Sequence, residues 1–550
     1  MSQGGFPAAT DGAVPAVSEQ SPLLGAQHAE ESQEHGGEPK EPNMREIVVI
    51  MSSIWLGVFL AALGTDQSRR YNHRRYPDSP HLLLFQLLLS LSWLATSYLI
   101  SNAAFQPLSG RLTDIYSRRA GLLFSNVFFA LGNLMCGLAK SEGMIVLGRV
   151  VAGIGGGGLT AISTFVTSDL VPLRKRGVWQ GIGNICYGAG SGLGGVFGGW
   201  INDSLGWRWA FLIQVPFLAV SCVLVLWKVR VPPKEANEAK LRQVDFLGAI
   251  MLVATLVLLL LGLNAGGNQV AWTHPLVLIS LPLSAVSLGV FVYIEANVAA
   301  KPVIPVRLLL DRTVFSACLT NWFSTMSVFG FLFYLPLFFQ VQGLSATAAG
   351  VRLIPQAVGT SVGSLGSGIL MRATGRYKIF SHVSMALQVS STALVCTLAL
   401  STPPWLPFLY FFLLGTAYGS MLTITLVALI SAVDHEYHAV VTSASYAFRS
   451  TGSSLGITVA SAVFQNILKS GLWSRFGDRR NAADLISRIR GSLDAIDRLP
   501  ADWRPGVLGA YMDSLRAVFL SLLGLGVLGA LVSLGMREHK LHSNLARRDR

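Results

Sequence analysis

The sequence contains little charge, few cysteines and no pattern typical of an enzyme active site. Charged residues are 13% of the chain and hydrophobic residues 51%, and so low a charged fraction excludes an ordinary soluble domain. The cysteines lie in apolar runs without paired spacing, which indicates neither a disulfide framework nor a zinc site; they are Cys136, Cys186, Cys222, Cys318 and Cys396. No segment resembles a P-loop, a metal cluster or a nucleophile elbow. We therefore expect a protein that is not an enzyme and holds no cofactor or metal.

Long apolar runs are what the sequence has instead. About 20 apolar residues span a bilayer core, and runs of that length recur from about residue 46 to about residue 535. We predict fourteen transmembrane helices, at 46–64, 84–108, 120–139, 143–167, 178–201, 207–229, 246–264, 274–296, 313–339, 347–371, 378–400, 405–432, 440–467 and 511–535. The sequence lacks the alternation that marks a membrane barrel. The predicted fold class is an all-α polytopic membrane protein.

The chain has a formal net charge of +13, and its Lys and Arg residues are distributed unevenly between the two predicted sides of the membrane. If both termini are cytosolic, the short cytosolic loops and the C-terminal tail contain 22 of the 42 Lys and Arg residues. The short loops on the opposite side contain two, Lys140 and Arg208. This bias follows the positive-inside rule. The charge therefore indicates orientation in a membrane and does not indicate nucleic acid as a partner.

A short motif occurs twice, each time between two apolar runs. Glycine and charged residues recur in both copies at offsets of zero, four and eight. The first copy consists of Gly110, Asp114, Arg118 and Arg119, and the second of Gly368, Arg372, Gly375 and Arg376. A repeat of this kind suggests two related halves.

The first copy resembles motif A of the major facilitator superfamily, and the second resembles its counterpart in the other half. Arg149, in the predicted helix 143–167, lies in a segment similar to motif B of that family. The helix 178–201 contains a stretch that resembles the glycine-rich antiporter motif C without its proline; its glycines are Gly190, Gly194, Gly198 and Gly199. The resemblance covers about residues 46–540, apart from 65–85.

Fourteen helices, together with segments near Trp93 and Trp207, look most like the fungal vacuolar basic amino acid transporters of the 14-helix drug:proton antiporter branch. This resemblance implies two six-helix bundles with an inserted helix pair. The expected regions are a disordered cytosolic tail at 1–45, a first bundle at 46–230, a linker with two inserted transmembrane helices at 231–312, a second bundle at 313–536 with a long non-cytosolic loop at 468–508, and a cytosolic tail at 537–550.

The two motif copies are expected to act as conformational latches, because they lie in cytosolic loops and cannot reach a substrate at the midplane. Asp114 can accept hydrogen bonds from the other bundle and Arg118 can pair with an acidic group. The alternative is a basic loop that only sets topology, which Arg118 and Arg119 would satisfy but Gly110 and Asp114 would not. Replacing Asp114 by Asn is expected to cripple transport without removing the protein from its membrane.

Charges inside the membrane are candidates for function, since an ionised side chain is costly there; they are Arg149, Glu295, Arg352, Arg449 and Arg516. The resemblance implies a role of Arg149 in proton coupling, and the alternative is a structural arginine bonded to backbone carbonyls. Arg449, with Tyr446 and Trp93, either lines the cavity or packs between helices. The motif C glycines serve antiport or ordinary close packing.

Two segments near the N-terminus are unusual. The first run ends early at Gly64, so that Asp66 is expected outside the helix, and residues 65–85 are either a genuine insertion or an error of the gene model. The family often has an Asp in this first helix, and no replacement is evident. In the tail, Glu19, Leu23 and Leu24 resemble an acidic dileucine sorting signal that a sorting adaptor would read, or they are an idle Leu pair.

The resemblance implies a monomeric secondary transporter that exchanges a small solute for protons by alternating access. Import of basic amino acids into the vacuole is the first expectation, which would place the chain in the vacuolar membrane. Efflux of drugs or secondary metabolites at the plasma membrane is the second. A transport-dead sensor or defective isoform is the third, because the first helix is disrupted.

Overall fold

The computed structural model describes residues 44–66, 97–106, 108–110, 112–113, 116–229, 245–266, 270, 272–298, 306–344, 346–399, 402–434, 437–478, 482, 486, 489, 503–539 and 541. The chain divides into two compact units, Met1–Ile47 and Val48–Arg550. Residues 44–47, the first turn of helix α2, are the described part of the first unit. The contacts below lie within the second unit.

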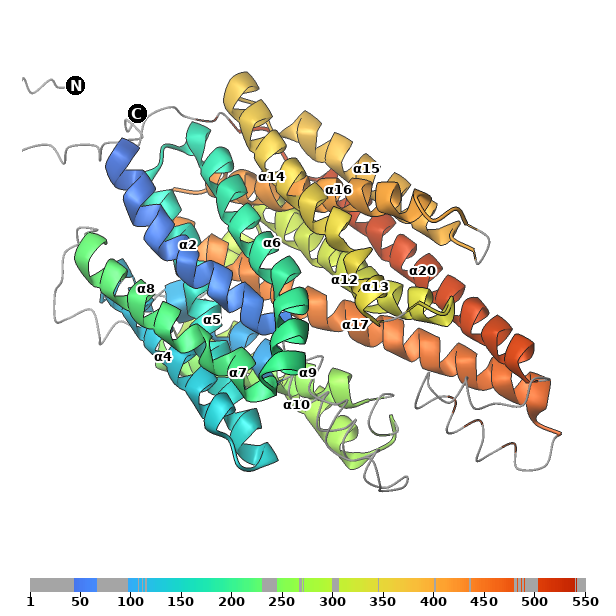
Figure 1. Ribbon diagram of the computed structural model, residues 1–550. Coiled ribbons are helices and arrows are strands. Elements are labelled where there is room, and N and C mark those ends of the chain that lie inside the picture. Colours follow the sequence, from blue (N-terminus) through green and yellow to red (C-terminus); the bar gives the residue numbers. More distant parts are fainter. Residues whose placement is uncertain are drawn as a thin grey trace, which may run out of the picture. The chain divides into compact units, whose positions relative to one another are not determined.

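Nearly all described residues of the second unit are helical (Figure 1). The first half comprises α2 (Met44–Asp66), a helical stretch at 97–106, α4 (Arg118–Leu138), α5 (Glu142–Leu170), α6 (Leu173–Ser204), α7 (Trp207–Leu212) and α8 (Gln214–Lys228). Then follow α9 (Phe246–Ala265), α10 (Pro275–Asn297) and α11 (Val306–Leu309). The second half comprises α12 (Arg312–Val341), α13 (Ala346–Val351), α14 (Ile354–Thr374), α15 (Lys378–Cys396), α16 (Leu406–Ser431), α17 (His438–Phe476) and α20 (Arg504–Ser533).

Nine helices in the described part of the chain are long and apolar enough to cross a membrane. Helices α6, α14 and α17 also have 32, 21 and 39 residues, and their many Gly and Ser residues lower their mean hydropathy. The prediction of an all-α multi-pass membrane protein is therefore confirmed. The count of fourteen remains a prediction.

Several helices extend further than predicted. Helix α2 has 23 residues and includes Asp66, so the expectations that the first helix is short and that Asp66 lies outside it are wrong. The apolar segment Ala61-Ala-Leu-Gly is followed by no proline before residue 77, and nothing therefore stops the helix at Gly64. Helix α17 runs to Phe476 and α20 begins at Arg504, which takes residues from both ends of the loop expected at 468–508.

The extension of α17 has a packing reason. Phe464, Leu468, Leu472 and Phe476 are buried at intervals of four residues, and together with Tyr511 of α20 they belong to the largest apolar core of the second half. Residues four apart lie on one face of a helix. Burial of that face stabilises the helix beyond the point where the sequence turns polar.

Close approach of helices in the first half depends on glycine. At Gly155 of α5, a Cβ atom would lie 2.3 Å from the backbone nitrogen of Phe129 in α4. No real Cβ atom tolerates such a distance, so the two backbones pack in contact there. The glycine-rich run of α5 is thus required by the fold itself.

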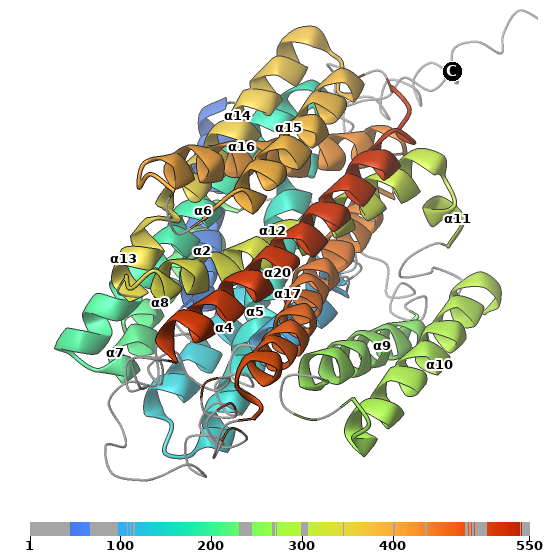
Figure 2. The ribbon, with the colours of Figure 1, turned by 90° about the vertical axis from the view of Figure 1, so that its right-hand side faces the viewer.

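The inserted helices α9 and α10 pack against each other (Figure 2), and α9 contacts both halves. Leu260 of α9 lies in a cluster with Ile100 and Ala103 of the first half. Leu252 and Leu256 of the same helix lie in a cluster with Ala444 of α17 in the second half. The helix pair therefore covers part of the interface between the two halves.

The C-terminal segment is bound to the loop between α14 and α15. The carboxylate of Glu538 accepts hydrogen bonds from the backbone amides of Tyr377 (2.8 Å) and Lys378 (3.0 Å), at the start of α15. The hydroxyl of Tyr377 donates to the carbonyl of Arg537 and contacts Nδ1 of His539 at 2.9 Å. Burial raises the pKa of Tyr377 to about 12, so the phenol remains a neutral donor at any physiological pH.

Candidate functional site

The first motif copy contacts the second half at the end predicted to be cytosolic. A Cβ atom on Gly110 would lie 2.3 Å from the hydroxyl of Ser443 and 3.4 Å from the carbonyl of Ala439, both in α17. A residue larger than glycine would force the hydroxyl of Ser443 to move away. The spacing that predicted Gly110 as special thus coincides with a close contact between the halves.

The second motif copy, which belongs to the second half, makes an equivalent contact with the first half. A Cβ atom on Gly368 of α14 would lie 2.4 Å from the carbonyl oxygen of Gly177 in α6. Nearby, Nε of Arg174 donates to the carbonyl of Arg372 at 2.9 Å, and another guanidinium nitrogen donates to the carbonyl of Ala373 at 3.4 Å. The two glycines of the repeat therefore both lie where one half contacts the other.

The other residues of the second copy have different surroundings. The side chains of Arg372 and Arg376 are exposed. Gly375 ends α14 with a φ of 69°, in the left-handed region that glycine adopts without strain. Gly368 lies within α14, as the helix predicted at 347–371 implies. Arg372, expected beyond the end of that helix, also lies within α14, because the helix continues to Thr374.

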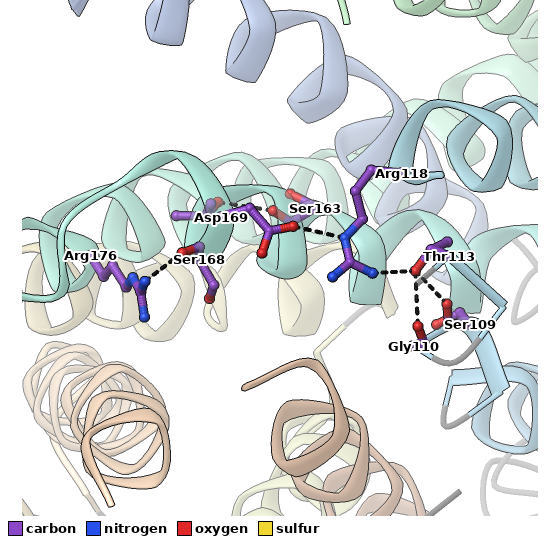
Figure 3. A network of polar contacts seen from close by, with 9 residues as sticks. Ser109, Gly110, Thr113, Arg118, Ser163, Ser168, Asp169 and Arg176 are labelled. Atoms are coloured by element: carbon purple, nitrogen blue, oxygen red, sulfur yellow. Dashed lines mark hydrogen bonds and ion pairs between the residues drawn. The ribbon is translucent and has the colours of Figure 1, made fainter. Parts of the chain in front are cut away.

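Arg118 is held within the first half (Figure 3). Its Nε lies 2.8 Å from a carboxylate oxygen of Asp169, near the end of α5, and another guanidinium nitrogen donates to Thr113 at 2.6 Å. Thr113 in turn donates to the carbonyl of Ser109 at 2.7 Å. The side chains of Arg118 and Asp169 are 6% and 16% exposed, so this is a largely buried ion pair. It joins the segment around Gly110 to α5.

Sequence reasoning expected an acidic partner for Arg118 but did not name Asp169. The available signal was Ser168-Asp169 at the end of the fourth apolar run, outside the predicted helix 143–167. Arg119 donates to the carbonyl of Leu226 in α8. Asp114 lies outside the described residues, and so do Trp93, Glu19, Leu23 and Leu24.

A polar cavity lies between the halves, further from the predicted cytosolic ends. It contains about 360 Å³ of empty space, open solvent at its mouth included. Its lining comes from α2, α5 and α6 of the first half and α17 of the second: Trp55, Val58, Thr160, Ser163, Thr164, Thr167, Trp179, Gln180, Gly183, Asn184, Tyr187, Tyr446 and Arg449.

Hydrogen bonds across this region join the halves. The hydroxyls of Thr164 and Tyr446 are 2.7 Å apart, and the amide of Asn184 donates to the hydroxyl of Ser364 in α14 at 2.8 Å. Both bonds are formed by neutral polar groups, whose net contribution is about 1 kcal/mol each. Such bonds hold the halves together without preventing their separation.

Arg449 provides the positive charge of the lining. It lies eleven residues after the start of α17, which is about 17 Å along the helix, near the middle of a bilayer core. Its guanidinium carbon lies 4.7 Å from the ring centroid of Tyr446. A charged arginine at this depth costs about 3 kcal/mol or more, so the cavity must supply compensation through water, aromatic rings or a ligand.

Tyr446 and Arg449 were predicted as cavity residues and the structure places both on the lining; their role with a substrate remains a proposal. Trp55, Trp179 and Tyr187 were missed, because aromatic residues in apolar runs look like packing residues. A polar stripe was readable: Thr160, Thr164 and Thr167, with Ser163, share one face of α5.

Arg149 is separate from this cavity. Its side chain is 1% exposed, and its guanidinium carbon lies 4.3 Å from the ring centroid of Tyr98. Among the glycines of the motif C stretch, Gly190 packs against α2, where a Cβ atom would lie 2.4 Å from the carbonyl of Phe59. Gly194 is buried. Gly198 and Gly199 belong to α6, and their surroundings lie outside the description.

The structure contains two groups of membrane helices that meet at one end and enclose a polar cavity between them. This arrangement is that of a multi-pass membrane carrier protein. The model of the Major Facilitator Superfamily matches residues 47–457, and the chain belongs to this family of secondary transporters. It is thus not an enzyme, as predicted.

Three similar proteins carry names that refer to different kinds of transport. The chain is 38% identical to the multidrug resistance protein fnx1 of Schizosaccharomyces pombe, over 90% of this chain and 94% of that protein. It is 35% identical to the vacuolar membrane amino acid uptake transporter fnx2 of the same yeast, over 86% and 81%. It is 33% identical to vacuolar basic amino acid transporter 2 of Saccharomyces cerevisiae, over 78% and 94%.

The fold is similar to that of solved transporters. The human organic anion transporter MFSD10 superimposes with a TM-score of 0.56 at 14% identity, covering 90% of this chain and all of that one. At this identity the likeness concerns the fold alone.

Proposed function

We propose that this protein imports basic amino acids into the vacuole in exchange for protons. The observation that carries the proposal is a cavity between the halves that combines one arginine with hydroxyl, amide and aromatic side chains. Such a lining suits a small zwitterion with a cationic side chain. The relatives at 33% and 35% identity, whose names refer to amino acids and the vacuole, support this substrate class and compartment.

Transport would proceed by alternating access. The contacts of Gly110 with α17 and of Gly368 with α6 close the predicted cytosolic side, and their release would open it while the opposite side closes. We propose that both motif copies act as latches, with Arg118 and Asp169 holding the first copy in place. Asp114 remains part of this proposal through its motif position.

Proton coupling rests on the family resemblance. Among the described residues that line the cavity, none is Asp or Glu, so no carboxylate of the lining is proposed as the proton carrier. Arg149 remains our candidate for coupling because of its place in motif B. The dileucine residues Glu19, Leu23 and Leu24 remain a proposed sorting signal for the vacuole.

Efflux of amphiphilic drugs is the second candidate, favoured by the 38% identity to a protein named for multidrug resistance and by the aromatic rings of the cavity. The third, a transport-dead isoform, was motivated by a disrupted first helix. Helix α2 has 23 residues, enough to span a bilayer, which weakens that motive.

Uptake into purified proteoliposomes tests the proposal. Vesicles with an acidic lumen and the protein oriented as in a vacuole are expected to accumulate labelled lysine, and an uncoupler is expected to abolish accumulation. Uptake of hydrophobic cations without lysine would favour drug efflux instead. No flux of either compound would favour the transport-dead isoform.

A further inference from the structure

We propose that Arg449 binds the carboxylate of the transported solute, so that the protein selects amino acids over the corresponding amines. This inference deepens the proposed function, on which it rests, by assigning one atom group of the substrate to one residue. The cavity, the charge of its lining and the position of Arg449 in α17 carry it.

The first step is the charge of Arg449. A guanidinium stays protonated at any accessible pH, and this one lies at the cavity. The ion pairs of Arg118 with Asp169 and of Arg475 with Asp513, both between described residues, do not include Arg449. The aromatic ring beside Arg449 is that of Tyr446, and Tyr187 lines the same cavity. The arrangement therefore presents a positive charge without a negative partner from the described lining.

The second step is the shape of that charge. A guanidinium offers a planar fork of donors that matches a carboxylate in two parallel hydrogen bonds. The guanidinium carbon lies over the ring of Tyr446, 4.7 Å from its centroid. The hydroxyl of Tyr446 is bonded to Thr164 at 2.7 Å, which fixes the ring that supports Arg449. The fork is thus preorganised, which lowers the entropic cost of binding.

The third step is the remainder of the cavity. Trp55 of α2 and Trp179 of α6 both line it, with ring centroids 5.9 Å apart. Their faces attract ammonium and guanidinium groups, whereas Arg449 repels them. A basic amino acid would then lie with its carboxylate at α17 and its side-chain cation toward the tryptophans, spanning both halves of the transporter.

Selectivity follows from this orientation. Cadaverine is lysine without its carboxylate, so it leaves Arg449 without a partner of opposite charge when it occupies the cavity. A site built to bind a polar group rejects an analogue that lacks it, because its own buried group then has no partner. The wild-type protein is therefore expected to transport lysine and to be inhibited only weakly by cadaverine.

The test compares labelled lysine and labelled cadaverine in proteoliposomes containing the wild type, Arg449→Gln, Arg449→Lys or Arg352→Gln. Arg352 is a matched control because its guanidinium also stacks on an aromatic ring, that of Phe339 at 5.2 Å, but lies outside the cavity lining. We expect Arg449→Gln to raise the KM for lysine about tenfold or more and to lower the KM for cadaverine. Arg449→Lys should restore part of the preference, and Arg352→Gln should keep it.

The outcomes separate this inference from the proposed function. Lysine transport by the wild type, with the same ratio of lysine to cadaverine in Arg449→Gln, would overturn the role of Arg449 and leave the proposed function standing. Absence of lysine transport by the wild type would overturn the proposed function. A parallel loss for both substrates in Arg449→Gln, with normal amounts of folded protein, would show a structural arginine and also overturn the inference.

Discussion

At the scale of single residues, the ion pair between Arg118 and Asp169 offers a direct test of the first latch. Arg118→Ala leaves a largely buried carboxylate without its partner, which costs roughly 3–5 kcal/mol. We expect at least a tenfold loss of lysine uptake at an unchanged amount of protein in the membrane. Uptake should return in part when the charges are exchanged in the double variant Arg118→Asp, Asp169→Arg. Wild-type uptake by Arg118→Ala would contradict a role of the pair in transport.

A second residue-scale test uses two glycines of the same helix. Gly368→Val places a side chain against the carbonyl of Gly177, whereas at Gly366 nothing lies within 4 Å of an added Cβ atom. We expect Gly368→Val to separate α14 from α6 and to open the cavity toward the cytosol. Gly366→Val should have little effect.

The readout is accessibility of the cavity residue Asn184, replaced by Cys in a background without native cysteines. A membrane-impermeant thiol reagent on the cytosolic side should label it severalfold faster in Gly368→Val than in Gly366→Val. Equal labelling of the two variants would contradict the close contact of α14 with α6 as a barrier.

Sequence reasoning identified Gly110, Gly368 and Arg118 but not what they contact. The repeated spacing identified these residues, because glycine and charged residues rarely recur at the same offsets in two segments by chance. Ser443 and Gly177 belong to no repeated pattern, and a single Ser or Gly in a helix is common. One sequence also does not reveal which residues far apart in the chain are in contact. Partners across the halves become visible only in the fold.

At the scale of elements, the C-terminal segment stabilises the start of α15. The carboxylate of Glu538 supplies the acceptor that α15 lacks, since Tyr377 at its N-cap provides no side-chain bond. Glu538→Ala should lower the free energy of unfolding by about 1 kcal/mol through loss of the cap and of its interaction with the helix dipole. The midpoint of thermal unfolding in detergent checks this.

Arg537→Ala is the matched control for that variant. The bonds found for Arg537 involve its backbone, so its midpoint should stay near that of the wild type. Equal midpoints for Glu538→Ala and Arg537→Ala would argue against the cap.

The lengths of α2 and α17 show what hydropathy misses at this scale. The predicted ends lie where the sequence turns polar, at Gly64 and after residue 467, yet both helices continue. Polar residues remain helical when the opposite face packs, as Leu472 and Phe476 do against α20. Apolar runs predict where a helix exists, and tertiary packing decides where it ends.

At the scale of the whole molecule, the halves must separate for transport. A Cβ atom on Gly188 of α6 would lie 3.6 Å from the hydroxyl of Ser361 in α14, so cysteines at these two positions would be neighbours on opposite halves. Oxidation of the double variant Gly188→Cys, Ser361→Cys should abolish lysine uptake, and a reductant should restore it. Each single variant serves as a control and should respond to neither reagent. Full uptake by the cross-linked protein would contradict alternating access through this interface.

The architecture as a whole was predictable because membrane helices and family motifs can each be recognised from a short continuous segment of the sequence. The cavity was predictable only in part, through Tyr446 and Arg449, because Trp55 of α2 and Trp179 of α6 are brought together only by the fold. Helices α9 and α10 were expected as an insertion, but the contact of α9 with both halves through Leu260 and Leu256 was not.

The contact made by Arg174 has a consequence for substitutions at the residues that it joins. Its guanidinium donates to the carbonyls of Arg372 and Ala373 and not to their side chains, and every amino acid provides that acceptor. Mutations at positions 372 and 373 therefore change the exposed charge of the second half without removing the contact. This contact by itself tolerates a change at either position, whereas it is lost when Arg174 is replaced.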